Sequence, residues 1–255
     1  MRTPKILITN DDGIYAPGIL SLRNAMNSIG EVTVVAPLAE KSAVGHAITV
    51  SDPLRVSEIE RDSNFFGYAV NGTPADCVKL GVRCLMDNKP DLVISGINLG
   101  PNTATNVIYS GTVSAAAEGT IMGIPSIAIS LTTFTKSNFS YAEEVAVLIA
   151  KKVLQNGLPE GTLLNINVPA VPKEEIQGMV ITRQGKGRYE EAFDKRIDPN
   201  NRTYYWLTGK RMILDQGDNI DDLVVMENKV AITPIRYDLT DYDFLKELSK
   251  WNLDA

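Results

Sequence analysis

The sequence of 255 residues contains a single histidine, His46, and two cysteines, Cys77 and Cys84. Catalytic zinc sites usually use two or three histidines, which this chain cannot supply. A Ser-His-Asp triad would have to use His46, and no Gly-x-Ser-x-Gly elbow accompanies it. The chemistry of the chain must therefore rest on carboxylates, amides, hydroxyls and a hard cation.

The two cysteines stand in a segment that the sequence pattern predicts to be helical. Their spacing separates them by roughly 10 Å along a helix, which is too far for a disulfide. We expect both to be small buried residues and the chain to be cytoplasmic. Residues 1–10 lack the apolar region and cleavage site of a signal peptide. No apolar run approaches about 18 residues, so we expect no membrane span.

Positive charge is also scarce, because 25 Lys and Arg residues face 31 Asp and Glu residues, for a net charge of −6. A broad basic surface for nucleic acid is therefore not expected, nor is a stable nucleic-acid partner. The remaining composition is ordinary for a globular protein of one large domain, or of one domain with an appendage. An acidic protein that handles phosphate must neutralise it locally, with a cation, an arginine or backbone amides.

Apolar strands and amphipathic helices alternate through the first two thirds of the chain. Each strand–helix–strand unit favours parallel strands. The alternation is typical of a doubly wound, Rossmann-like α/β fold with a mostly parallel sheet. The predicted strands are 5–10, 32–36, 65–70, 92–95, 126–131 and 163–168, and the predicted helices are 18–29, 73–86, 112–122 and 141–154.

The alternation ends after Val168. Residues 184–225 are polar, charged and aromatic, with no clear helical period. A loop of that length is usually functional, as an interaction arm or a lid, although a surface β-hairpin is the plainer alternative. We predict a single domain, 1–255, with an α/β core over 1–178 and an extension over 179–255. Within the extension, the predicted strands are 179–183 and 230–234, and the terminal helix is 241–251.

The first strand ends in Asn10-Asp11-Asp12-Gly13, and ligands of doubly wound folds bind at the carboxyl ends of strands. Two carboxylates about 4 Å apart repel by roughly 4 kcal/mol at an effective dielectric of 20. A hard divalent cation with oxygen ligands would relieve that repulsion. Alternatively, both aspartates cap a turn, for which Asp-Asp-Gly is a good sequence. Their position after an apolar first strand favours the metal site.

Later loops offer neutral groups to the same edge of the sheet. Ser42 follows the second strand and Asn98 follows the fourth, and their oxygens could complete the metal coordination. Ser110-Gly111-Thr112 begins a helix, where free backbone N–H groups form a ready phosphate site, although an ordinary N-cap has the same composition. We expect this segment to bind phosphate together with Asn10 and Asn102.

Several familiar signatures are missing. The chain has neither the P-loop pattern nor Gly-x-Gly-x-x-Gly after the first strand. Asp11-Asp12-Gly13 departs from the D-x-D pattern of aspartyl-phosphate phosphatases, so metal-activated water is favoured, without excluding Asp11 as a nucleophile. We interpret His46 as a partly exposed loop residue and Asp76 as a complement to a helix dipole.

Spaced segments in a fixed order resemble the SurE survival-protein family of nucleotidases over nearly the whole chain. They are densest in the first half. The order is a more specific signal than any one segment. The segments are 10–13, 16–19, 35–37, 72–78, 95–102, 109–113, 164–169, 232–234 and 238–240.

The resemblance implies a 5′- and 3′-nucleotidase that needs one divalent cation per subunit, Mg²⁺ or Mn²⁺, and acts on nucleoside monophosphates, with a secondary activity on short polyphosphate as a further expectation. It assigns the metal to Asp11, Asp12, Ser42 and Asn98, and phosphate binding to 110–112. It also implies homodimers or homotetramers that exchange C-terminal segments, which would explain the arm.

The chain departs from the family pattern at two positions. Ala43 follows Ser42 where the family commonly has glycine. Some members carry a histidine near position 236, where this chain has Arg236, so an acid role for that histidine is not transferred.

The expected catalytic residues are Asp11, Asp12 and Asn98. Either aspartate would orient or deprotonate water at the cation, and Asn98 with the amides of 110–112 would hold the charge that develops on phosphate. Two rival classes stay open. One is a non-catalytic module that binds nucleotide or metal in the same cleft. The other is a hydrolase of a different bond, such as a metal-dependent deacetylase, which the scarcity of histidine disfavours.

Overall fold

The computed structural model describes residues 2–135, 138–251 and 253, and eleven strands form its two sheets. The strands predicted from the apolar runs are all present, with ends that differ by a few residues. The strands are β1 (Lys5–Thr9), β2 (Glu31–Pro37), β3 (Val56–Arg61), β4 (Asn64–Val70), β5 (Leu92–Leu99), β6 (Ser126–Leu131), β7 (Thr162–Val168), β8 (Met179–Ile181), β9 (Arg188–Ile197), β10 (Thr203–Met212) and β11 (Val230–Arg236).

The main sheet has nine strands in the order β3-β4-β2-β1-β5-β6-β7-β11-β8. The run from β4 through β7 is parallel, whereas β3 is antiparallel to β4 and β11 is antiparallel to β7. The predicted mostly parallel, doubly wound α/β fold is therefore confirmed. Strands β8 and β11 come from the predicted extension and complete one edge of the main sheet.

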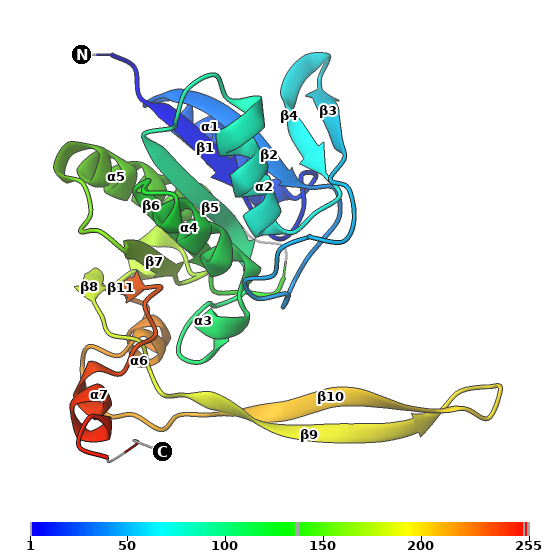
Figure 1. Ribbon diagram of the computed structural model, residues 1–255, viewed down its shortest axis with the longest axis vertical. Coiled ribbons are helices and arrows are strands. Elements are labelled where there is room, and N and C mark those ends of the chain that lie inside the picture. Colours follow the sequence, from blue (N-terminus) through cyan, green and yellow to red (C-terminus); the bar gives the residue numbers. More distant parts are fainter. Residues whose placement is uncertain (1, 136–137, 252, 254–255) are drawn as a thin grey trace.

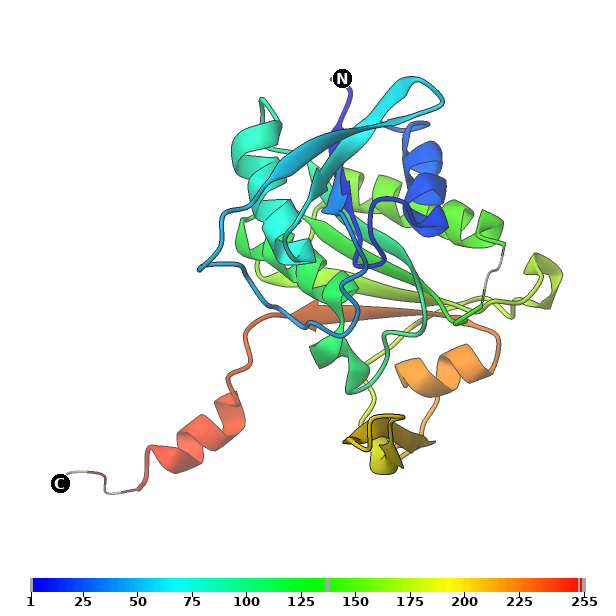
Figure 2. The ribbon, with the colours of Figure 1, turned by 90° about the vertical axis from the view of Figure 1, so that its right-hand side faces the viewer.

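Helices cover both faces of this sheet, with α1 and α5 on one face and α2 and α4 on the other (Figure 2). A π-helical turn (Gly81–Leu85) continues α2, and a short 3₁₀-helix (Lys173–Glu175) lies in the loop after β7. The helices are α1 (Pro17–Met26), α2 (Pro74–Leu80), α3 (Asn106–Tyr109), α4 (Gly111–Ile121), α5 (Ser140–Asn156), α6 (Asp221–Met226) and α7 (Tyr242–Leu248).

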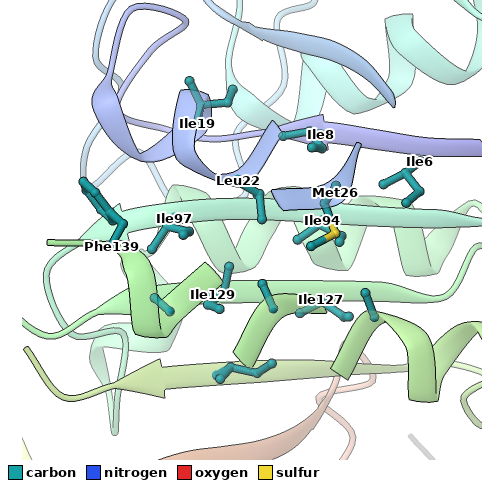
Figure 3. Packing of buried hydrophobic residues seen from close by; sticks show 14 of the residues in the cluster. Ile6, Ile8, Ile19, Leu22, Met26, Ile94, Ile97, Ile127, Ile129 and Phe139 are labelled. Atoms are coloured by element: carbon teal, nitrogen blue, oxygen red, sulfur yellow. The ribbon is translucent and has the colours of Figure 1, made fainter. Parts of the chain in front are cut away.

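The core follows from strands that are buried on both faces. Side chains alternate across each strand, so Ile6 and Ile8 pack toward α1 and α5, while Leu7 packs toward α2 and α4. Figure 3 shows Leu22 and Met26 of α1 between the isoleucines of β1 and those of β5. The rigid sheet fixes the strand ends, where the candidate site lies.

The start of α2 illustrates how the sequence specifies its local structure. Thr73 caps the helix by accepting a hydrogen bond from the Asp76 backbone N–H, and the Asp76 carboxylate accepts from the Thr73 N–H at 2.9 Å. Pro74 occupies the first helical position, as predicted. Asp76 also accepts from the Thr49 N–H at 3.0 Å, so it anchors the loop before β3 as well as complementing the helix dipole.

Four elements differ from the sequence expectations. β5 continues through Asn98 to Leu99, where a loop is expected from the Gly-x-Asn sequence, and Ile97 is buried within it. β3, α3 and α6 are not predicted from the sequence. The expectation that both cysteines are buried is wrong for Cys84, which is exposed, whereas Cys77 is buried between α2 and the sheet.

The segment between β8 and β11 contains a long hairpin, the arm, formed by β9 and β10 alone. The arm extends away from the sheet, and α3 and α6 lie between the sheet and its root (Figure 1). Its strands expose large apolar side chains, among them Phe193 and Trp206. The plainer alternative of a surface β-hairpin is thus confirmed for this segment. Across the described part of the chain, no helix combines the length and apolarity needed to cross a membrane.

Candidate active site

A cavity of about 1020 Å³ opens at the carboxyl ends of the central strands. Five of the residues that the sequence singles out line it together, although they come from four separate segments. In doubly wound folds the loops that follow neighbouring parallel strands meet at one edge of the sheet, which explains why these residues converge. The five residues are Asp11, Ser42, Asn98, Asn102 and Ser110.

Asp11 is buried at the end of β1 and faces the N-terminus of α4. The Thr112 hydroxyl donates a short hydrogen bond to its Oδ1. A Cβ built on Gly111 would lie 2.8 Å from the Asp11 Cβ, so only glycine allows this close approach. Burial raises the pKa of Asp11, while the hydrogen bonds from Thr112 act to lower it.

Asp12 is half-buried beside Asp11. Its Oδ2 accepts a hydrogen bond from the Leu99 N–H at 3.3 Å, which links β1 to the end of β5. Burial, and then the neighbouring charge of Asp11, raise the pKa of Asp12 to about 7. Two carboxylates are thus held together where water solvates them poorly.

Ser42 lies on an exposed loop at the rim of the cavity. The loop is fixed by the Lys41 N–H, which donates to the Asp11 carbonyl at 2.7 Å, and the Ser42 hydroxyl donates to Glu40 at 2.6 Å. The next residue, Ala43, has φ of +57°, in the left-handed region that favours glycine. Ala43 therefore stands where the family commonly has glycine, at a position whose backbone conformation suits glycine better.

Asn98 and Asn102 bracket the loop after β5. The Asn98 amide donates to the Gly100 carbonyl at 2.8 Å, and the Asn102 amide donates to Ser130 at 2.8 Å. Asn167 of β7 accepts from the Asn102 N–H at 2.8 Å and donates to its carbonyl at 3.1 Å. Asn165 donates to the same carbonyl at 2.7 Å. The loop is therefore held by a buried asparagine clamp.

Ser110 caps α4 by accepting from the Val113 N–H at 3.1 Å, and it lines the cavity. Gly111 and Thr112 follow in the first turn and contact Asp11. Asn10 is fully buried and donates to the Gly13 carbonyl at 2.9 Å, so its amide closes the 10–13 turn behind the cavity.

His46 is partly exposed, as interpreted, and its Nε2 lies 2.9 Å from the buried carboxylate of Glu118 on α4. Lys79 of α2 also pairs with Glu118, at 2.6 Å. Burial acts to raise the pKa of Glu118, but the hydrogen bonds from His46 and Lys79 outweigh it and hold that pKa below its ordinary value. The loop that carries Ser42 is thus tied to α4.

Three sets of cavity or supporting residues escape the sequence analysis. Arm residues such as Tyr189 and Leu207 line the cavity, and so does Phe134 after β6. Asn165 and Asn167 support the site from β7. The asparagines carried a signal, because amides are unusual in an apolar strand. The arm residues carry no sequence signal beyond their aromatic character, because they reach the site only through the position of the folded hairpin.

The donor set suits a hard divalent cation. Asp11, Asp12, Ser42 and Asn98 would offer it carboxylate, hydroxyl and amide oxygens, the type of ligand that Mg²⁺ and Mn²⁺ prefer. Thr9 Oγ1 and Asn10 Oδ1, at the end of β1, and Ser95 Oγ, which lies within β5 opposite Thr9, are buried oxygens without a hydrogen-bond partner in the described residues. Within those residues, no cluster of three or more His, Cys, Asp and Glu side chains competes as a metal site.

Comparison with known proteins gives a consistent result. The family model for Survival protein SurE matches residues 6–191. The chain is 49% identical to a protein named 5′-nucleotidase SurE from Syntrophobacter fumaroxidans, over 98% of this chain and 100% of that one. A similar relative from Chlorobium limicola is 48% identical, over 99% and 98% of the two chains. The crystal structure of the SurE protein from Aquifex aeolicus superimposes with a TM-score of 0.84 at 46% identity, covering 96% of this chain and 98% of that one.

Proposed function

Because the chain belongs to the SurE survival-protein family, we propose that it is a phosphoric monoester hydrolase that converts nucleoside monophosphates to nucleoside and phosphate. The observation that carries the proposal is the shared cavity of Asp11, Ser42, Asn98, Asn102 and Ser110. They supply a carboxylate for a cation, and hydroxyl and amide groups for phosphate, gathered where the fold binds ligands.

Asp11, Asp12, Ser42 and Asn98 would hold one divalent cation, Mg²⁺ or Mn²⁺. Such a cation, when bound, supplies Lewis acidity toward a phosphoryl oxygen and lowers the pKa of water. The cation is a proposal supported by the carboxylate, hydroxyl and amide oxygens that these residues offer, of which those of Asp11, Ser42 and Asn98 belong to residues that line the cavity.

The remaining steps use groups of this chain. One carboxylate of the Asp11–Asp12 pair orients the attacking water, while the N-terminus of α4 and the amides of Asn98 and Asn102 stabilise charge on the phosphoryl oxygens. Asn10 supports this arrangement from behind, by closing the turn that presents both aspartates. The leaving group is the nucleoside hydroxyl.

Several finer features belong to the same proposal. The substrates include 3′- as well as 5′-monophosphates, and short polyphosphate is a secondary substrate. The chain forms one domain that assembles as a homodimer or homotetramer through its C-terminal segment. The exposed apolar side chains of the arm and of α7 support this assembly. Cys77 and Cys84 are both free cysteines, which supports a cytoplasmic location.

A phosphate-release screen tests the proposal. Nucleoside 5′- and 3′-monophosphates, an aryl phosphate, tripolyphosphate and an acetylated amine are each incubated with Mg²⁺, Mn²⁺, Zn²⁺ or EDTA. We expect release from nucleotides with Mg²⁺ or Mn²⁺ and none with EDTA. Nucleotide binding without turnover of any phosphate ester would favour the binding module, and deacetylation would favour the other hydrolase class.

A further inference from the structure

The cavity is larger than a phosphate and its cation require. Its volume of about 1020 Å³ lies at the upper end of the range of small-molecule pockets, about 300–1,000 Å³. The polar groups that we assign to the reaction make up only part of the lining. The lining also includes a set of large apolar and aromatic side chains from three segments, which we call the apolar end: Tyr109, Phe134, Tyr189, Leu207, Met212 and Leu214.

The core contributes one side of this apolar end. Tyr109 directly precedes Ser110, which we assign to phosphate binding, and the residue is 59% exposed. Phe134 is 77% exposed, and its ring lies over Gly100, where a built Cβ would come within 2.8 Å of Cε1. Exposed aromatic faces inside a concave site are costly in water unless a ligand covers them.

The arm contributes the opposite side. Tyr189 of β9 pairs in register with Arg211 of β10, so both side chains project from the same face of the hairpin. The Arg211 guanidinium donates to Thr103 at 2.9 Å and forms a short ion pair with the buried Asp222. These contacts hold the root of the arm at the site, where Tyr189 and Leu207 of that face, and Met212 of the other face, line the cavity.

Hydrogen bonds hold the root of the arm against the loop after β5. Asp221 accepts from the Ala104 N–H at 2.9 Å and from the Gly185 N–H at 2.8 Å. The Gln184 amide donates to the Ala104 carbonyl at 2.8 Å, and the Thr105 hydroxyl donates to the Gly187 carbonyl at 2.8 Å. In both whole-chain views α3 lies between the sheet and the arm (Figures 1 and 2). The arm side of the cavity is therefore fixed relative to the phosphate end.

We propose that the arm is part of the substrate site, and that the nucleobase is held between the aromatic side chains of Phe134 and Tyr109 on the core and Tyr189 on the arm. This inference rests on the proposed nucleotidase function, because the phosphate end sets where the base lies. Stacking on aromatic rings contributes about 1–3 kcal/mol per base and tolerates every base. The arm then makes the enzyme selective for nucleotides over simpler phosphate esters.

The test compares AMP with ribose 5-phosphate, which keeps the phosphoester and sugar but lacks the base. For Tyr189→Ala and Phe134→Ala, we expect the ratio of kcat/KM for AMP to that for ribose 5-phosphate to fall about tenfold. Tyr189→Phe retains the ring and should restore the ratio. Tyr205→Ala is the matched control, because Tyr205 is exposed on β10 outside the cavity, and its ratio should equal that of the wild type.

Binding of adenosine, measured by calorimetry, is the second readout and does not depend on turnover. We expect its Kd to rise by a similar factor in the two alanine variants and to stay unchanged in the control. Equal losses for both phosphate esters, or unchanged kinetics and adenosine affinity, would overturn the base site. If the wild type hydrolysed no nucleotide, the proposed function would fail, and the adenosine measurements would still decide whether this end of the cavity binds a base.

Discussion

The polar cluster at the strand ends and the β9–β10 arm each place side chains where globular proteins usually avoid them. At the strand ends, Asp11, Asn10, Asn165 and Asn167 are buried, and most of their polar atoms are hydrogen-bonded within the core. On the arm, large apolar side chains are exposed. Buried polar groups cost stability unless they are paired, and exposed apolar groups cost solubility.

The buried polar groups of the cluster and the exposed apolar groups of the arm have different consequences. The cluster is rigid because each amide has a defined partner, so it can hold a small charged ligand in one geometry. The arm gains its stability from its own two strands and offers surface to other molecules. Changes in the cluster should therefore affect chemistry, and changes beyond the arm root should affect assembly.

Asp11→Asn should have the largest effect. The substitution keeps the shape and the acceptor for Thr112 but removes a charge from the cation site. We expect nucleotide turnover with Mn²⁺ to fall by about 10³-fold or more, with thermal unfolding nearly unchanged. Asp243→Asn on the exposed surface of α7 is the matched control. Activity near the wild-type level in Asp11→Asn would sink the site assignment.

Shortening the arm should change assembly strongly and stability little. Glu190 and Lys210 lie opposite each other, so replacing residues 191–209 by Asn-Gly closes a two-residue hairpin and keeps Tyr189 and Arg211. We expect a smaller species in light scattering and a melting temperature within about 3 °C of the wild type, since the removed apolar groups are exposed. An unchanged mass would contradict the role of the arm in assembly.

Asn167→Leu should weaken both the cluster and its chemistry. The change leaves the buried Asn102 N–H without an acceptor, which costs about 1–3 kcal/mol. We expect the melting temperature to fall by roughly 3–10 °C and kcat to fall with it, because Asn102 loses its fixed position. Asn156→Leu at the exposed end of α5 is the control. If Asn167→Leu were destabilised but kept a normal kcat, the asparagine clamp would not be needed for catalysis.

Glu118→Gln should have a moderate effect that depends on pH. The folded-state pKa of Glu118 lies below its ordinary value of 4.5, so its ion pairs stabilise the fold above about pH 4.5 and that stability is lost as the pH falls through the lowered pKa. We expect a loss of about 1–2 kcal/mol near neutral pH, since His46 and Lys79 are partly exposed. Melting curves between pH 7 and 3.5 should show the difference from wild type shrinking toward acid. A difference that stayed constant with pH would contradict the ion-pair origin.

Ala43→Gly should have the smallest effect. Relief of the left-handed strain outweighs the greater chain entropy of glycine, so we expect a stabilisation of about 0.5 kcal/mol. Ala47→Gly, at an ordinary φ in the same loop, should instead be neutral or destabilising. Chemical denaturation of the two variants side by side measures the sign, and destabilisation by both would contradict the strain.

Much of the fold could be predicted from the sequence because its strands and helices carry their own periodicity. Thr73-Pro74 and Asp76 specify the start of α2 locally, and the apolar runs specify the buried strands. β5 extends past its apolar run because Ile97 packs into the core, which no local pattern around Gly96 indicates. β3 and the arm strands are exposed on nearly the whole of both faces, so they lack the alternation that marks a strand with one buried face.

The candidate site could be predicted in part for a similar reason. Asp11, Asn98 and Ser110 stand at strand or helix ends, which the fold class brings together. Tyr189 is held at the cavity by contacts that no local pattern indicates, among them the hydrogen bond from Arg211 to Thr103, 108 residues away in the sequence. Asn10 illustrates the limit of a motif, since the next residue, Asp11, lines the cavity, whereas the Asn10 amide closes the turn by donating to the Gly13 carbonyl.

The separation in sequence of the groups that meet around the cavity has a consequence for folding kinetics. The Thr112–Asp11 hydrogen bond spans 101 residues, the Asn102–Asn167 bond 65, and the Ala104–Asp221 bond 117. Contacts of such range form late, because each requires the closure of a long loop. Recovery of hydrolysis after refolding should therefore lag behind the return of helical circular dichroism, which makes turnover a stringent measure of the completely folded chain.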